Sequence, residues 1–183
     1  THSMHRRATN TMAQPQDISR HTLSVLVDDV DGIITRVTAL FTRRGYNLVS
    51  LVSAKTATEG INRLTVVVDA SEHAVEQIVK QLYKLIQVHK VLELDDDSTV
   101  GRQLLLVKVD ADNTTRPQVV DAANLFRARV IDVAVDSVVI EATGTSAKLK
   151  AFLEVMDSFG IRELVRSGTV ALSRGPKTMA PAD

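Results

Sequence analysis

The sequence predicts an α+β protein built from two copies of a β-α-β-β-α-β unit in tandem. Three observations support this fold class. Short runs of alternating apolar and polar residues are typical of half-buried strands. Between these runs, apolar residues recur every three or four positions, as they do on amphipathic helices. The order of strands and helices that precedes the polar stretch at residues 95–102 is repeated after it.

The first unit is expected at residues 21–95 and opens with the strand pattern TLSVLVD, which Leu26 interrupts. An amphipathic helix follows, with Gly45 as its left-handed stop. NLVSLVSAKTA and INRLTVVVDA read as two strands joined at Thr58–Gly60, and Ser71 is placed to cap a second helix. VHKVLEL makes the last strand, which completes a ferredoxin-like order. The apolar stripes of the two helices are Ile33, Val37, Leu40 and Phe41, and Val75, Ile78, Val79, Leu82 and Ile86.

The second unit is expected at residues 103–176, after a linker at residues 96–102 and before a tail at residues 177–183. LLLVKVD forms its first strand, and Pro117 opens its first helix. RVIDVAV and SVVIEATG are the next two strands, and IRELVRSGTVALSR supplies one or two more. The helical stripes are Val119, Val120, Ala123 and Phe126, and Leu149, Phe152, Leu153, Met156 and Phe159.

Composition limits the function classes. The chain has 183 residues, of which 44% are hydrophobic, so it can form packed cores. Lys plus Arg equals Asp plus Glu at 22 each, which argues against nucleic acid or a membrane surface as partner. The lack of cysteine excludes disulfides and thiolate chemistry. No apolar run approaches the roughly 18 residues of a membrane span, so a cytoplasmic location is expected.

Residues 1–20 are expected to be a disordered lead or an expression remnant, with Met12 as a candidate native start. This stretch has no apolar core and therefore does not read as a signal peptide.

The sequence offers little for catalysis or metal binding. The five histidines are scattered without zinc-site spacing, and the glycine-rich phosphate-binding and nucleophile motifs are absent. Adjacent carboxylates at Asp28–Asp29 and Asp95–Asp97 fall on expected loops, where solvation is the ordinary explanation. No catalytic residue and no metal ligand is therefore assigned, and the chain is predicted to be a binding protein.

The stretch VLVDDVDGIITRVTALFTRRGYN suggests where a ligand would bind. A helix N-terminus favours a carboxylate, and Gly32 would let one approach the amides of Ile33 and Ile34. Asn47 can donate and accept hydrogen bonds, and Asp29 suits an ammonium group. In this fold Gly32 and Asn47 lie at opposite ends of one helix, so two subunits are needed to combine them. The alternative is that Gly32 is only a turn residue and Asn47 only a helix-exit residue.

The same residues carry a family resemblance. HTLSVLVDDVDGIITRVTALFTRRGYNLVSLVSAKT resembles the ACT domain that opens the regulatory (small) subunit of acetohydroxyacid synthase, also called acetolactate synthase. QIVKQLYKLIQVHKV, LLLVKVDAD, IDVAVDSVVIEATGTSAKL and GIRELVRSGTVALSRGPK resemble later parts of that family in the same order. The resemblance runs from about His21 to Lys177 and outweighs the alternative reading of Gly32 and Asn47.

The resemblance implies a subunit without catalysis of its own. It implies activation of a separate large subunit, which carries thiamine diphosphate, magnesium and FAD, and feedback inhibition by valine, often also by leucine or isoleucine. The pathway is branched-chain amino acid biosynthesis. The effector would lie between the ACT domains of a homodimer. The family's effector positions correspond to Asp29, Gly32 and Ile33 of one chain and to Asn47 and Leu48 of the other.

One position departs from the family pattern. Many members have proline before the glycine, where this chain has Asp31; an aspartate there can cap the helix and compete with the effector's carboxylate.

Two other function classes fit less well. A stand-alone tandem ACT sensor of another system would be supported by a DNA-binding motif or a basic patch, and neither is present. A small enzyme of the acylphosphatase kind would need a phosphate-cradling loop with an arginine, whereas DDVDG is acidic.

Overall fold

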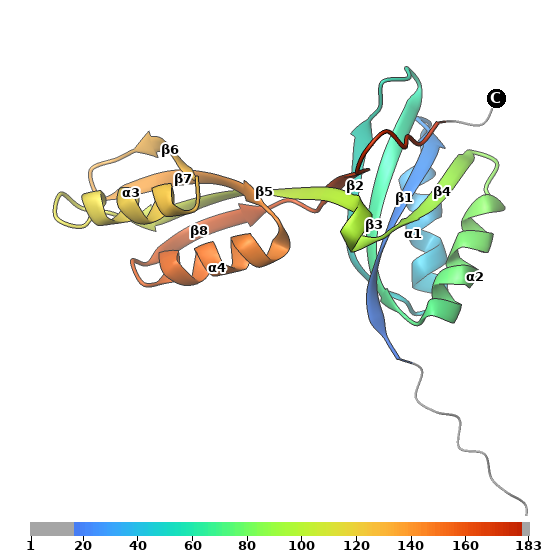
Figure 1. Cartoon of the computed structure of the whole chain (residues 1–183), viewed down its shortest axis with the longest axis horizontal. Helices are drawn as coiled ribbons and strands as arrows, with labels where there is room; N and C mark the ends of the chain where they lie inside the picture. Colours follow the sequence, from blue (N-terminus) through green and yellow to red (C-terminus); the bar gives the residue numbers. More distant parts are fainter. Residues whose placement is uncertain (1–16, 181–183) are drawn as a thin grey trace, which may run out of the picture.

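The computed structural model describes residues 17–180 and shows two domains that follow one another along the long axis of the molecule (Figure 1). The first contains β1 (Ser19–Asp28), α1 (Ile33–Arg43), β2 (Asn47–Lys55), β3 (Ile61–Ala70), α2 (Glu72–Tyr83) and β4 (Val88–Leu94). The second contains β5 (Thr99–Asp110), α3 (Arg116–Leu125), β6 (Arg129–Val133), β7 (Ser137–Gly144), α4 (Ser146–Asp157), β8 (Ile161–Arg166) and β9 (Val170–Ser173). The predicted tandem of ferredoxin-like units is confirmed.

Both sheets are antiparallel and have the same strand order. The first runs β2-β3-β1-β4 and the second β6-β7-β5-β8, with the first strand of each unit in the interior. Each domain carries its two helices on one face of its sheet (Figure 1). Most of the expected N-terminal lead lies outside the described residues, although Ser19 and Arg20 already belong to β1. No helix of the described chain is long and apolar enough to cross a membrane.

The helical stripes pack where the periodicity predicts, with one error. In α1, Ile33, Val37 and Phe41 are buried, and Ser71 caps α2 by accepting from the Ala74 amide at 3.1 Å. The expectation that Ile86 continues the buried stripe of α2 is wrong: Ile86 is 90% exposed. The helix ends at Tyr83 in tight turns, so the helical spacing no longer applies beyond it.

Phe126 lies one residue beyond α3 and still packs inward. Its ring meets that of Phe152 edge-on, with the centroids 5.3 Å apart. Phe152 is fully buried in the core of the second domain.

The helix-free face of the first sheet is also covered, which explains why Leu26 breaks the alternation. Leu26 and Ser24 lie on this face and are almost fully buried. The covering layer includes a two-stranded ribbon in which Thr99–Arg102 of β5 pairs with β9. The stretch expected as a linker, 96–102, thus contains a 3-10 turn (Asp96–Ser98) and the first residues of β5.

Candidate functional site

The loop between β1 and α1 is held by backbone hydrogen bonds from two neighbouring turns. The Asp29 amide donates to the Gly60 carbonyl at 2.9 Å, and the Asp28 amide donates to the Gln87 carbonyl at 2.9 Å. Gly32 ends the loop with a φ of +81°, a conformation that L-residues with a side chain rarely adopt. The loop therefore has a defined path, and glycine is required where it turns into the helix.

The N-terminus of α1 is uncapped. Gly32 is the N-cap residue, and no side chain of the described residues hydrogen-bonds to the helix start. The first hydrogen bond of the helical i to i−4 type is donated by the Arg36 amide to the Gly32 carbonyl at 3.0 Å. Within residues 17–180 the amides of Ile34 and Thr35 have no acceptor. This is the arrangement that attracts a carboxylate.

Asp31 does not take the capping role that the sequence suggested. It is exposed, and the residue at the cap position is Gly32 rather than Asp31. A Cβ added to Gly32 would meet nothing within 4 Å, so the space in front of the free amides is open. The competition expected from Asp31 is therefore not seen in this structure.

The predicted site residues beside Gly32 offer different groups. Ile33 is 4% exposed and belongs to the core, and its amide already donates to the Val30 carbonyl at 3.4 Å, so the free amides are those of Ile34 and Thr35 rather than that of Ile33. Ile34 is 36% exposed and can offer its side chain as well as its amide. Asp28 is engaged by His89, with Oδ1 and Nε2 2.6 Å apart. Asp29 is exposed and has no side-chain partner in the described part of the chain.

Asn47 lies at the other end of α1 and is oriented by a carboxylate. Its Nδ2 donates to Asp69 Oδ2 at 3.2 Å, which leaves its Oδ1 as the acceptor for a ligand. Asp69 also accepts from Arg20 Nε at 3.0 Å and Nη2 at 3.2 Å. The hydrogen bond from Arg20 holds the pKa of Asp69 below its usual range. Leu48, the next residue, is half-buried against the core of the first domain.

Arg20 and Asp69 could not be predicted from the sequence because their role depends on strand register. Asp69 is paired with Arg20 of β1 and with Asn47 of β2, and no local pattern announces either pairing. An isolated Arg near the expected lead and an Asp in a strand carry no signal by themselves.

Within one chain the two groups of site residues cannot meet. The 11 residues of α1 separate them, a length of about 16 Å at 1.5 Å per residue. An α-amino acid is too short to span that distance. The structure thus places Asp29, Gly32, Ile33 and Ile34 together, and Asn47 with Leu48 at the opposite end.

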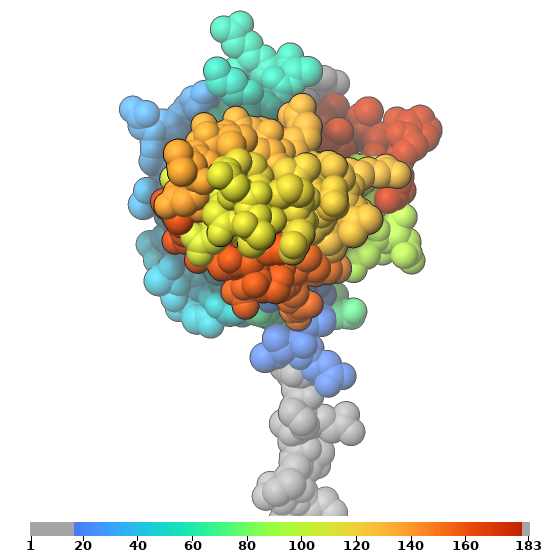
Figure 2. All heavy atoms as spheres, turned by 90° about the vertical axis from the view of Figure 1, so that its left-hand side faces the viewer, coloured from blue at the N-terminus to red at the C-terminus, as the bar shows by residue number. Residues whose placement is uncertain are grey.

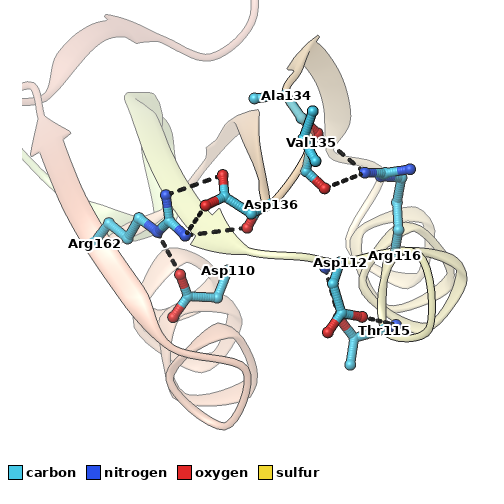
Figure 3. A network of polar contacts seen from close by, with 8 residues as sticks. All are labelled: Asp110, Asp112, Thr115, Arg116, Ala134, Val135, Asp136 and Arg162. Carbon is cyan, nitrogen blue, oxygen red and sulfur yellow. Dashed lines mark hydrogen bonds and ion pairs between the residues drawn. The ribbon is translucent and has the colours of Figure 1, made fainter.

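The second domain repeats the framework of this loop, and Figure 3 shows the polar contacts around it. The Asp110 amide donates to the Gly160 carbonyl, and the Ala111 amide to the Asp136 carbonyl, each at 2.9 Å. Arg162 of β8 binds Asp110 in the position where His89 of β4 binds Asp28. Arg162 also pairs with Asp136 at 3.2 Å and holds the pKa of that carboxyl below its usual range.

In the second domain, by contrast, a carboxylate of the chain itself holds the turn that leads into α3. Asp112 Oδ1 accepts from the amides of Thr114 at 2.8 Å and Thr115 at 2.9 Å. These backbone bonds, with that of Thr115 the stronger, lower the pKa of Asp112. Arg116 ties the β6–β7 turn to α3 by donating to the carbonyls of Ala134 and Val135 (Figure 3). The turn before α3 is therefore held by a carboxylate of the chain, whereas within residues 17–180 no side-chain carboxylate binds the amides at the start of α1.

No group of three or more metal-ligating side chains occurs among the described residues.

Comparisons with known proteins cover both halves of the chain. Residues 23–90 match the family described as an AHAS small subunit-like ACT domain, and residues 102–175 match the small subunit of acetolactate synthase. The acetolactate synthase small subunit of Mycolicibacterium smegmatis is 51% identical over 162 residues, 88% of this chain and 95% of that protein. A probable acetolactate synthase small subunit of Archaeoglobus fulgidus is 44% identical over 158 residues, 86% of this chain and 99% of that protein.

A solved structure agrees with these matches. The crystal structure of an acetolactate synthase small subunit from Thermotoga maritima superposes with a TM-score of 0.82 at 34% identity. The match covers 87% of this chain and all of that one.

Proposed function

The chain belongs to the family of acetolactate synthase small subunits, and from this premise we propose that it is a feedback-regulatory subunit. It activates a separate catalytic large subunit and makes that enzyme sensitive to valine, with leucine and isoleucine as further effectors. The observation that carries the proposal is the uncapped N-terminus of α1 in the ACT domain. It offers free amides and an open approach to an amino-acid carboxylate.

A homodimer would complete the site. β2 is at the edge of its sheet, and in the described chain its outer side has no strand partner, so a second copy can pair with it. α1 contacts β2 and α2 contacts β4, which places α1 near the same edge. A two-fold axis at the β2 edge would set the α1 helices of the two chains antiparallel. Gly32 of one chain would then face Asn47 of the other.

Each end of the effector has a chemical partner in this arrangement. The carboxylate would accept from the free amides at the start of α1. The ammonium would donate to Asp29 and to Asn47 Oδ1 of the second chain, which Asp69 keeps oriented. The apolar side chain would rest on Ile34 and on Leu48 of the second chain.

The expected affinity suits a metabolite sensor. Charge-assisted hydrogen bonds contribute about 1.5–3 kcal/mol each, and burial of a valine-sized side chain contributes about 1.5–3 kcal/mol. Against these stand the losses of rotational and translational freedom on binding. The balance corresponds to a dissociation constant between roughly micromolar and millimolar.

A contact between the domains offers a route for regulation. A Cβ on Gly168, in the loop between β8 and β9, would lie 2.5 Å from Val52 Cγ2 and 3.4 Å from Ser50 Cβ. These residues belong to β2, the strand that begins with Asn47. A shift of β2 on effector binding would therefore reach the second domain directly. Inhibition further requires that valine bind the low-activity state of the complex more tightly than the high-activity state.

The cofactors are expected on the partner. Thiamine diphosphate, magnesium and FAD belong to the large subunit, and this chain supplies regulation only. The match of residues 102–175 to the small-subunit family favours this role over that of a stand-alone tandem ACT sensor.

Reconstitution with the large subunit tests the proposal. Acetolactate formation from pyruvate is measured for each subunit alone and for the mixture, with and without valine. We expect no turnover by this chain alone, a higher rate for the mixture than for the large subunit, and inhibition of the mixture by valine. An unchanged rate on mixing, or a mixture insensitive to all three amino acids, would contradict the proposal.

A further inference from the structure

A cleft of about 480 Å³ lies between the helix-free face of the first sheet and the C-terminal segment of the chain. One wall is the end of the β2–β3 hairpin, residues 55–63, and the opposite wall is residues 172–179. Leu26 of β1 also lines it. In Figure 2 the hairpin tip (teal) and the C-terminal segment (red) both project beyond the second domain. The cleft is separate from the amides of α1.

The charged residues that line this cleft are all cationic. They are Lys55, Arg63 and Lys177, and none of the lining residues is Asp or Glu. Thr56 and Thr58 add hydroxyl groups, and the rest of the wall is largely apolar, with Leu26, Ile61, Leu172 and Met179. Like charges gathered in one cleft repel each other more strongly than they would in open solvent.

Arg63 is the least exposed of the three cations and has no carboxylate partner within residues 17–180. Its Nε is buried without a hydrogen-bond partner among residues 17–180, and the residue as a whole is half-buried. Burial lowers the pKa of the guanidinium group, with no carboxylate to offset it. By contrast, Arg20, Arg129 and Arg162 each pair with a carboxylate.

A half-buried cation whose Nε has no partner is costly, and the surroundings of Arg63 suit a ligand that would supply an anionic partner. We propose that the cleft binds a small organic anion, namely a phosphate or carboxylate group carried on an apolar body of a few carbon atoms. The guanidinium fork of Arg63 holds the oxyanion, and Lys55 and Lys177 add charge from opposite walls. Leu26, Leu172 and Met179 contact the apolar body.

The cleft also lies next to a turn that holds the β1–α1 loop. Thr58 and Ile61, which line the cleft, flank Gly60, whose carbonyl accepts from the Asp29 amide. A bound anion would therefore brace the turn that holds the β1–α1 loop. Anion binding in the cleft does not depend on valine binding, because the two ligands use different residues.

Binding of three simple compounds to the full chain tests the assignment. Butyl phosphate, butyrate and butylammonium are titrated by calorimetry in phosphate-free buffer at low salt. We expect binding of at least one of the two anions and none of butylammonium. The anion that binds with the higher affinity identifies the preferred oxyanion as phosphate or carboxylate. Inorganic phosphate, titrated as a further probe, measures how much the apolar body contributes to the affinity.

Two variants and a matched control locate the binding. Arg63→Met should weaken anion binding by at least about tenfold, the loss expected for one charge-assisted hydrogen bond. Lys177→Met should weaken it as well and changes only the C-terminal wall. Lys150→Met removes an exposed cation of α4 in the second domain and should leave binding unchanged. Without anion, Arg63→Met should raise the melting temperature, since it removes a desolvated charge.

Absence of binding by both anions would overturn the inference. Anion binding that survives both Arg63→Met and Lys177→Met would also overturn it, because the site would then lie elsewhere on the chain.

Discussion

Replacing Gly32 by aspartate should weaken valine binding while the protein still folds. The new carboxylate would lie at the free amides of α1 and repel the carboxylate of the effector. The φ of +81° at this position adds backbone strain, about 1–2 kcal/mol for an ordinary L-residue and less for Asp, which tolerates this region. A Cβ would meet no neighbour within 4 Å, so no steric cost adds to the strain.

The size of the binding defect follows from the contacts that are lost. Loss of one charge-assisted hydrogen bond, about 1.5–3 kcal/mol, raises the dissociation constant by roughly ten- to 150-fold. Calorimetry with valine measures this, and thermal unfolding measures the strain. Gly175→Ala is the control for strain, because Gly175 has a φ of +73° and open space around it. It should lose at least as much stability as Gly32→Asp yet bind valine normally. Normal valine affinity in Gly32→Asp would refute the role of this helix end.

Three further changes test other parts of the account. Asn47→Ala should weaken valine inhibition in the reconstituted enzyme and leave activation nearly intact; an equal loss of both would mean that Asn47 is structural. Gly168→Ala should lower the melting temperature by pushing its loop away from Val52, and an unchanged value would refute the close packing. Asp112→Ala should lower the melting temperature at pH 7 without affecting valine binding. Because the folded-state pKa of Asp112 is depressed, its stabilisation is present above the unfolded value of about 4. That stabilisation is lost as the pH falls through the folded-state pKa. The stability difference between the variant and the parent should therefore vanish in acid. A difference that persists there would contradict the role of Asp112 in holding the turn before α3.

Much of the fold could be predicted because its determinants are local. The strand at Val88–Leu94 and the strand at Ser137–Gly144 have the predicted bounds, since period-two alternation and flanking turns define them. The cap at Ser71 was predicted from its position before a helical stripe. Ile86 was misplaced because the spacing alone does not show where a helix ends.

Contacts between distant segments could not be predicted in the same way. The β5–β9 ribbon covers the second face of the first sheet, and only this tertiary contact explains the burial of Leu26. In the candidate site, Gly32 and Asn47 could be predicted from the chemistry of helix termini. Asp69, which orients Asn47, depends on the register of three strands and has no sequence signature.

The central claim is that each effector site takes Gly32 from one chain and Asn47 from the other, and mixed dimers test it most directly. Two differently tagged chains are co-expressed, the heterodimer is purified, and bound valine is counted by calorimetry. A heterodimer of Gly32→Asp with Asn47→Ala should bind one valine with parental affinity, because one site receives both intact residues. A heterodimer of the doubly substituted chain with the parent should bind none at that affinity. The reverse pattern, with binding only in the second heterodimer, would show that a single chain forms the site and would contradict the account.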